Sequence, residues 1–237
     1  MSDESKRPRE VTDGEDIKTL REAARVFFSR PGPRFIAKNA AIAWSVRALL
    51  GPPRPSELAI CAGVVAWWPL QEWLAHKYIL HLEPREIFGT RIDPMFAQKH
   101  RAHHANPRDV DFTLLPMEVL RAAMPANVAV WLLSTGMRRQ AVTGVAAFAT
   151  MALAYEWTHF IVHTGVKPKT AYGKRVRQNH RMHHYRNENY WFGFIAPLVD
   201  RVLGTEPEPR DVPFSKTARD LFGLGAADAR KSDAPVG

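Results

Sequence analysis

All ten histidines of this 237-residue chain fall into four short clusters, and this arrangement constrains the fold more than any other feature. Histidine is the commonest metal ligand among side chains because its neutral ring offers a nitrogen lone pair near physiological pH. One zinc ion usually takes four ligands, so ten histidines exceed the need of a single ion. The clusters predict a multinuclear metal site, with candidate ligands His76, His81, His100, His103, His104, His159, His163, His180, His183 and His184.

The spacing within the clusters predicts helices. Two triplets of the form His-x-x-His-His lie at residues 100–104 and 180–184, and a pair at residues 159–163 has three residues between its histidines. Side chains at i, i+3 and i+4 share one face of a helix, so each cluster can present its rings together. His76 and His81 are five residues apart, which requires a turn or helix end between them if the rings are to converge.

The ligand type leaves several metals open. All-nitrogen ligation suits zinc, copper, iron or nickel, and the usual affinity order does not select among them. A hydrolytic zinc site needs only about three protein ligands and one open position. Ten ligands fit two metals with an open position on each, where oxygen could bind between them. Two redox-active irons with dioxygen would suit such a ligand count.

Composition narrows the class of protein. Cys61 is the single cysteine and lies in an apolar run, so a disulfide framework or thiolate metal site is excluded and a small buried hydrophobe is expected. The net charge of +9 fits a nucleic-acid-binding surface or a membrane protein with basic cytosolic faces. The residues before Arg34 are polar and show no secretory signal.

Four stretches of the chain are long, apolar and poor in charge, and they lie at residues 35–50, 58–75, 114–135 and 141–155. A spanning helix needs about 20 mainly apolar residues, so the first and fourth are borderline alone. We predict an all-α integral membrane protein with about four transmembrane helices in two hairpins and a cytosolic, histidine-rich helical cap. A soluble helical protein is the alternative, and the mean hydropathy of −0.28 favours it slightly.

The distribution of basic residues predicts the orientation in the membrane. Of the 33 lysines and arginines, residues 1–34 hold 8, residues 76–113 hold 6 and residues 164–237 hold 13. A four-span topology places these segments on one side, which the positive-inside tendency identifies as cytosolic. The histidine clusters and both termini are therefore expected on the cytoplasmic side. Three arginines in the two short connections run against this bias.

Polar segments flank the predicted membrane domain, which covers residues 34–206. In the N-terminal segment, residues 1–33, the pattern of residues 15–30 predicts an amphipathic helix on the membrane surface, with an ordinary packed helix as the alternative. Residues 207–237 form a polar, partly disordered tail. Disorder is expected for the first 14 residues and from about Ala226.

The four histidine motifs, HX4H, HX2HH, HX3H and HX2HH, resemble those of the fatty acid hydroxylase superfamily of membrane di-iron enzymes. The flanking sequence is most similar to the fatty acid 2-hydroxylase branch. The similar segments are EWLAH at 72–76, HLEP at 81–84, HHANPRD at 103–109, YEWTH at 155–159, HHY at 183–185, FGF at 192–194 and DRVLGT at 200–205. The resemblance covers roughly residues 55–206. It departs from the family at 110–116, VDFTLLP, and in having no room for a fused cytochrome b5 domain in residues 1–33.

The resemblance implies a chemistry and its partners. Two iron ions would be bound by the ten histidines, with zinc able to substitute in purified protein. O2 would be the co-substrate, a membrane lipid the substrate, and an external electron-transfer protein of the cytochrome b5, ferredoxin or reductase type the donor. The implied reaction is hydroxylation of a fatty acyl chain, with the 2-position as the candidate carbon.

Several alternatives use the same residues. A sterol desaturase or oxidase and a carotenoid hydroxylase use the same di-iron site. A non-enzymatic membrane metal-binding protein is a more distant alternative hypothesis. A nucleic-acid partner is not expected, because the basic residues flank apolar spans instead of forming a soluble stripe.

Carboxylates near the clusters are candidates to orient the ligands, because a metal-bound histidine usually donates its other ring N–H to a carboxylate or carbonyl. The nearest in sequence are Glu72, Asp109, Glu156 and Asp200. A helix-surface or capping role is the alternative for each. Tyr185 and Asn187 follow the last triplet and are candidates for substrate contacts. Residues that could line the path of an acyl chain are Trp67, Trp68, Phe112, Leu115 and Trp131, although such residues more often face lipid or core.

Overall fold

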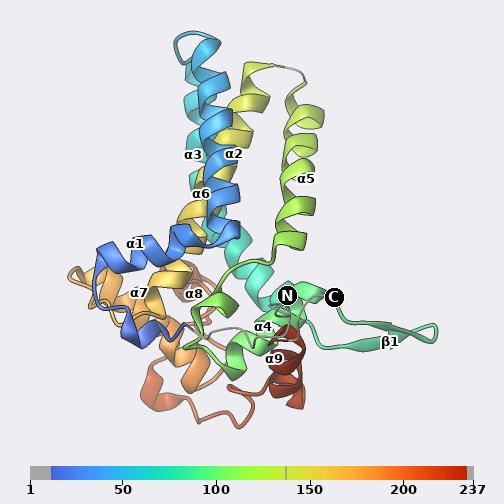
Figure 1. Cartoon of the computed structure of the whole chain (residues 1–237), viewed down its shortest axis with the longest axis vertical. Helices are drawn as coiled ribbons and strands as arrows, with labels where there is room; N and C mark the ends of the chain where they lie inside the picture. Colours follow the sequence, from blue (N-terminus) through green and yellow to red (C-terminus); the bar gives the residue numbers. More distant parts are fainter. Residues whose placement is uncertain (1–11, 137, 234–237) are drawn as a thin grey trace, which may run out of the picture.

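The computed structural model of the chain describes residues 12–136 and 138–233, and this part is mostly helical. Four helices stand side by side and project from the rest of the molecule (Figure 1). They are α2 (Pro31–Leu49), α3 (Pro55–Ala75), α5 (Met117–Thr135) and α6 (Arg139–Val162). Helix α6 packs against the other three, so this bundle is built around it.

Short connections pair the four helices as the sequence predicted, α2 with α3 and α5 with α6. Gly51 has a φ of 91° and Gly136 has a φ of 73°, a left-handed backbone that favours glycine just after a helix. Pro55 opens α3, where its fixed φ and missing N–H suit the first turn. The turn-forming residues thus end one helix and start the next.

Two helical segments, Pro55–Leu80 and Arg139–Val162, are long and apolar enough to cross a membrane. Among the described residues, α2 and α5 do not meet that test; each has 19 residues and carries charged side chains. In α2 one of these charges is matched, because buried Arg47 pairs with buried Glu57 of α3. Length and composition therefore support two of the four predicted spans.

The remaining elements form a cap at one end of the four helices (Figure 1). Its helices are α1 (Leu20–Ser29), α4 (Met95–Ala105), α7 (Ala171–Tyr185), α8 (Leu198–Val202) and α9 (Gly225–Asp233). Short helical turns lie at Gly14–Asp16, Val110–Thr113, Pro209–Asp211 and Leu221–Gly223, and the π-helical turn His76–Leu80 continues α3.

A two-stranded antiparallel hairpin extends sideways from the cap, and the all-α prediction did not include it (Figure 1). It pairs β1 (Arg85–Ile87) with β2 (Thr90–Ile92). The two turn residues, Phe88 and Gly89, both have positive φ, as a tight two-residue hairpin turn requires. The three-residue strands are too short to show an alternating pattern in the sequence.

Helix α1 lies at the foot of α2, runs out to one side of the bundle (Figure 1) and contacts α2 and α6. Thr19 and Glu22 form a reciprocal capping box, which is why the helix starts after Thr19 and not near residue 15 as predicted. Phe27 is buried against Phe160 of α6, with ring centroids 5.3 Å apart, while Phe28 is exposed. The helix is therefore packed on the bundle, and contact with a membrane surface stays a prediction.

The two ends of the described chain are more ordered than the sequence predicted. Gly225–Asp233 form helix α9, which packs along α4, so the expectation of disorder from about Ala226 is wrong for these residues. Residues 12–17 are held between two loops: the Gly14 N–H donates to the Arg108 carbonyl at 2.7 Å, and the Gly165 N–H donates to the Gly14 carbonyl at 2.9 Å. Residues 1–11, also expected to be disordered, lie outside the described residues.

Candidate metal centre

The structure brings all ten histidines together where α3 and α6 meet α4 and α7 of the cap. They form two groups, and within each group the candidate ligand atoms lie within 4.8 Å of one another. The His76 group contains His76, His81, His100, His104 and His183, and the His159 group contains His103, His159, His163, His180 and His184.

The two His-x-x-His-His triplets divide between the groups. Helix α4 contributes its i and i+4 histidines to the His76 group and its i+3 histidine to the His159 group, whereas α7 does the reverse. Positions i+3 and i+4 lie about 100° apart around a helix, so neighbouring histidines can face different centres. The ring centroids of His104 and His184, one from each group, lie 4.3 Å apart. The two groups are therefore adjacent, as a dimetal site requires.

A π-helical turn brings His76 and His81 to the same group. The His81 N–H donates to the His76 carbonyl at 3.2 Å, an i to i+5 bond that widens the turn. Residues five apart then lie nearly above one another, and both rings reach His183, with centroid distances of 4.5 and 5.0 Å. The spacing of His76 and His81 predicted a turn or helix end between them, and the π-helical turn is the change of helix geometry that brings the two rings together.

The Nε2 atoms point into each group. In the His76 group, Nε2 of His100 lies 3.2 Å from Nε2 of both His76 and His104. In the His159 group the three corresponding contacts are 2.7, 3.0 and 3.1 Å. Each group is thus a compact set of nitrogen donors.

Backbone carbonyls fix the tautomers of three rings. Nδ1 of His76, His104 and His183 lies 2.6, 2.7 and 2.8 Å from the carbonyl oxygens of Phe192, Ala218 and Tyr190, respectively. A carbonyl only accepts, so Nδ1 carries the proton and Nε2 keeps its lone pair. His104 and His183 direct these lone pairs at each other across 3.2 Å. Two lone pairs at that distance repel unless a cation lies between them, so the donor set fits a metal ion.

Burial keeps the rings neutral. Removal from water lowers the pKa of His104 to about 3 and lowers the pKa of His103, His183 and His184 well below its ordinary value. Neutral imidazole is the form that binds metal, so the rings need not lose a proton first. One histidine in each group is only partly buried, His81 in the first and His163 in the second.

Glu72 and Asp200 act on a loop that supplies one of these carbonyls. Glu72 accepts two backbone N–H bonds from residues 192–195 at 2.6 and 3.0 Å, and Asp200 accepts two at 2.9 and 2.7 Å. The same loop carries the Phe192 carbonyl that binds His76. Burial raises the pKa of the Asp200 carboxyl to about 6, although its hydrogen bonds act in the opposite direction. We therefore propose that both carboxylates orient His76 through this loop.

Removing the Asp200 carboxylate is expected to weaken metal binding. Asp200→Ala leaves two buried loop N–H groups without their acceptor and frees the carbonyl that orients His76. We expect metal affinity to fall about 10–100-fold, the usual effect of losing an orienting partner, as measured by chelator competition. Asp211→Ala, at an exposed carboxylate, is the control. Equal affinities in the two variants would contradict this role.

The other two carboxylates have different places. Glu156 accepts the Leu115 N–H at 3.0 Å, and the backbone of Thr113, two residues earlier, hydrogen-bonds His159. Glu156 therefore binds the segment before α5, and the backbone of the same segment hydrogen-bonds His159. Asp109 is the N-cap of the turn after α4 and accepts a backbone N–H at 3.1 Å. This is the capping role that was the alternative to orienting a ligand.

The two candidate substrate residues lie beyond the last triplet. Both ends of the Asn187 amide bind backbone groups, an N–H at 3.0 Å and a carbonyl at 3.3 Å, so this side chain holds the turn after α7. Tyr185 is exposed, and its ring lies 6.0 Å from the Arg181 guanidinium and 5.2 Å from that of Arg219. A substrate contact stays a prediction for both residues.

Sequence reasoning missed the packing around the rings. Phe194 stacks on His159 with centroids 5.0 Å apart, and the Phe192 ring lies 5.6 Å from His76. Between them, a Cβ on Gly193 would lie 2.6 Å from a Val199 methyl, so glycine is needed. In the sequence, residues 192–194 stood out only because their FGF pattern resembles that of the family. No residue type marks a carbonyl that will face a ring, so the sequence held no signal for those partners.

An apolar cavity of about 550 Å³ lies between α3, α5 and α6. Two of the residues expected along the acyl path line it, Trp67 and Trp131. A series of ring contacts leads from the cavity wall to the His159 group; in order the rings are Phe148, Trp68, Tyr155 and Phe194, with centroids 5.0, 6.3 and 4.9 Å apart. A continuous set of packed aromatic rings therefore links the cavity wall to the histidines.

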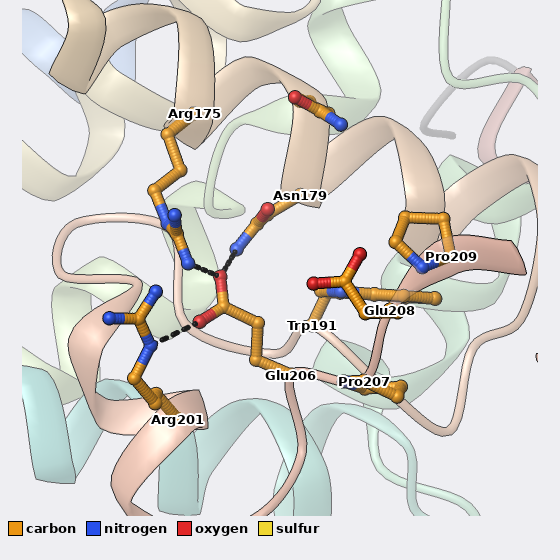
Figure 2. Close-up of a pocket in the computed structure, with 9 residues that line it drawn as sticks. Arg175, Asn179, Trp191, Arg201, Glu206, Pro207, Glu208 and Pro209 are labelled. Carbon is orange, nitrogen blue, oxygen red and sulfur yellow. Dashed lines mark hydrogen bonds and ion pairs between the residues drawn. The ribbon is translucent and has the colours of Figure 1, made fainter. Parts of the chain in front are cut away.

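A polar cavity of about 300 Å³ lies beside α7 and contains none of the predicted site residues. Figure 2 shows its Glu206 carboxylate held by Arg175, Asn179 and Arg201. Glu208 also lines the cavity, so its two arginines are matched in number by two carboxylates. These contacts brace α7 against the segment that follows α8.

Comparison with known proteins agrees with this geometry. A family model described as fatty acid hydroxylase matches residues 61–205. Dihydroceramide fatty acyl 2-hydroxylase FAH2 of Arabidopsis thaliana is 27% identical over 164 residues, which cover 69% of this chain and 67% of that protein. Fatty acid 2-hydroxylase of Rattus norvegicus is 29% identical over 151 residues, covering 61% of this chain but 38% of that protein. The chain thus matches well under half the length of the rat relative.

A solved structure shows the same fold. Full-length scs7p, in which only the hydroxylase domain is visible, aligns with a TM-score of 0.58 at 20% sequence identity. The alignment covers 84% of this chain and 70% of that one. At this identity the likeness concerns the arrangement of the helices.

Proposed function

The chain belongs to the fatty acid hydroxylase family, and from that membership we propose that it is a membrane di-iron enzyme that hydroxylates a fatty acyl chain at the 2-position with O2. The observation that carries the proposal is the pair of buried groups of five histidines, whose lone pairs face one another. The names of the Arabidopsis and rat relatives support an acyl substrate and the 2-position.

In this proposal each histidine group holds one iron, and zinc can take the same positions because all-nitrogen ligation suits both metals. Bound iron would supply the activation of O2 and the oxidation of an unactivated C–H bond. The protein's part is to hold the ligands: the three backbone carbonyls keep Nε2 of His76, His104 and His183 directed inward. Burial of most of the rings excludes water from the reaction.

The apolar cavity is the proposed site for the acyl chain. It lies between the helices that carry His76 and His159, and its wall includes Gln71, five residues before His76 or about 7.5 Å along α3. The ring series that ends at Phe194 would guide the chain toward the histidines. We further propose that all four bundle helices enter the bilayer, with the cap and both termini cytoplasmic, as the basic residues favour.

Lipid analysis tests the proposal directly. Cells that express the chain are expected to accumulate acyl lipids that have gained one oxygen, with fragmentation placing the hydroxyl at carbon 2, because the site would insert one atom of O2. Comparative mass spectrometry makes the measurement, and His103→Ala expressed at the same level is the control. Loss of two hydrogens without added oxygen would indicate a desaturase, and an unchanged lipid profile would refute an acyl-lipid oxidase.

A further inference from the structure

A strongly basic cavity opens at the one partly buried ligand of the His159 group. It has a volume of about 360 Å³, and His163 forms part of its wall. Four arginines and an exposed tyrosine surround the opening: Arg108, Arg177, Arg181, Arg219 and Tyr185. We call it the His163 pocket. None of the four arginines is part of the proposed hydroxylation chemistry.

Two of the arginines are fixed by neutral groups next to the ligands. Arg177 donates to the Thr164 and Val166 carbonyls at 2.5 and 2.6 Å, just beyond His163. Arg219 donates to the carbonyls of His104 and Ala105 at 3.1 and 2.9 Å. Carbonyls accept hydrogen bonds without cancelling charge. Both guanidiniums are therefore held in place while their positive charge still faces the pocket.

Acidic groups balance only part of the remaining charge. Arg108 pairs with Asp13 at 2.9 Å, and Glu15 lies 3.9 Å from Arg177. Arg181 is exposed and contacts the Tyr185 ring. Arg181 and His163 line the same cavity, so this positive charge lies near the partly buried ligand. The cavity in Figure 2 differs, because both of its arginines bind the Glu206 carboxylate and Glu208 supplies a second negative charge to its lining.

Hydroxylation needs a supply of electrons. Inserting one oxygen atom of O2 into a C–H bond gives an alcohol and one water, which consumes two electrons and two protons from outside the lipid. A redox protein has to bring its own centre close to the metals, and His163 offers a direct route because it is a partly buried candidate ligand in the wall of this basic pocket. Excess positive charge attracts an acidic partner, and Arg and Tyr are typical of protein interfaces.

Resting on the proposed function, we propose that the His163 pocket is the docking surface for an acidic electron-transfer protein. The four arginines steer and orient the partner, and His163 lies at the contact with its redox centre. Such a carrier is oxidised by one electron at each of two encounters per hydroxylated lipid. Because the attraction is ionic, the association weakens as salt rises.

The test uses the full-length, iron-loaded protein in nanodiscs of zwitterionic lipid, with an acidic [2Fe–2S] ferredoxin and its NADPH-dependent reductase as the probe. Arg181→Glu reverses one pocket charge, Arg181→Lys keeps it, and Arg85→Glu makes the same reversal on the hairpin that projects from the cap. Ferredoxin binding is measured at about 50 and 500 mM salt, which changes the screening length severalfold. Hydroxylation is measured at steady state with ferredoxin. It is measured separately as a single turnover with dithionite, which reduces the protein without oxygen and is removed before O2 is added, because dithionite itself consumes O2.

Arg181→Glu is expected to weaken ferredoxin binding at low salt about tenfold and to slow ferredoxin-driven hydroxylation about tenfold more than dithionite-driven hydroxylation. Arg181→Lys and Arg85→Glu should resemble the unchanged protein. Equal binding by Arg181→Glu and the unchanged protein overturns the proposal. Binding of the same variants to vesicles that contain phosphatidylglycerol is measured as well. If Arg181→Glu loses vesicle binding but keeps ferredoxin binding, the pocket is a lipid head-group site and the proposal is also overturned. No hydroxylation of any lipid with dithionite defeats the proposed function instead, while the binding measurement still tests docking.

Discussion

Replacing His104 by alanine is expected to lower the metal content from about two ions per chain to about one and to abolish hydroxylation. Nε2 of His104 lies 3.2 Å from Nε2 of both His100 and His183, so the substitution removes the nitrogen that links these ligands. The loss of activity should exceed the roughly 10–100-fold effect of losing a group that only orients a ligand. Elemental analysis of the purified protein and product analysis by mass spectrometry make the measurements.

The division into two groups supplies a reciprocal experiment. His184→Ala should also leave about one metal, but in the His76 group, because His184 belongs to the His159 group. Gln178→Ala, at an exposed position of the same helix α7, is the matched control and should keep both metals and full activity. Retention of two metals and activity by both histidine variants would show that these nitrogens are not ligands.

The sequence could not predict how each triplet divides its histidines between the two groups. The i, i+3, i+4 spacing predicted rings on one face of a helix, and α4 and α7 are indeed helices. One face is wide enough, however, to reach two centres, and which histidine serves which group depends on how α4 and α7 cross. The same limit applies to the Phe192, Tyr190 and Ala218 carbonyls, because every residue has one.

Local signals predicted the bundle better than the cap. Gly51, Pro55 and Gly136 mark chain reversals by their own backbone preferences, so both helical hairpins followed from short stretches of sequence. Helix α9 has no such mark: its residues are polar, and its place depends on α4, more than 100 residues earlier, as the Arg101–Asp228 pair shows. When the stability of a helix comes from a partner far away in the sequence, its own residues predict a disordered tail.

The buried Arg101 makes this dependence measurable. It lies in α4 directly after His100, has no exposed surface, and binds Asp228 and Asp93 at 2.6 Å each. Arg101→Met is expected to destabilise the cap by about 3–5 kcal/mol, because it leaves two buried carboxylates without their shared guanidinium.

That loss should lower the unfolding midpoint on the order of 10 °C, as measured by thermal denaturation in detergent. Arg91→Met is the matched control, because Arg91 also pairs with Asp93 but its side chain is 58% exposed, so a change of about 1 kcal/mol or less is expected. The metal content of Arg101→Met should fall as well, since α4 carries ligands of both groups. Equal midpoints for the two variants would mean that α9 does not depend on this ion pair and that α4 is held in place by its apolar contacts alone.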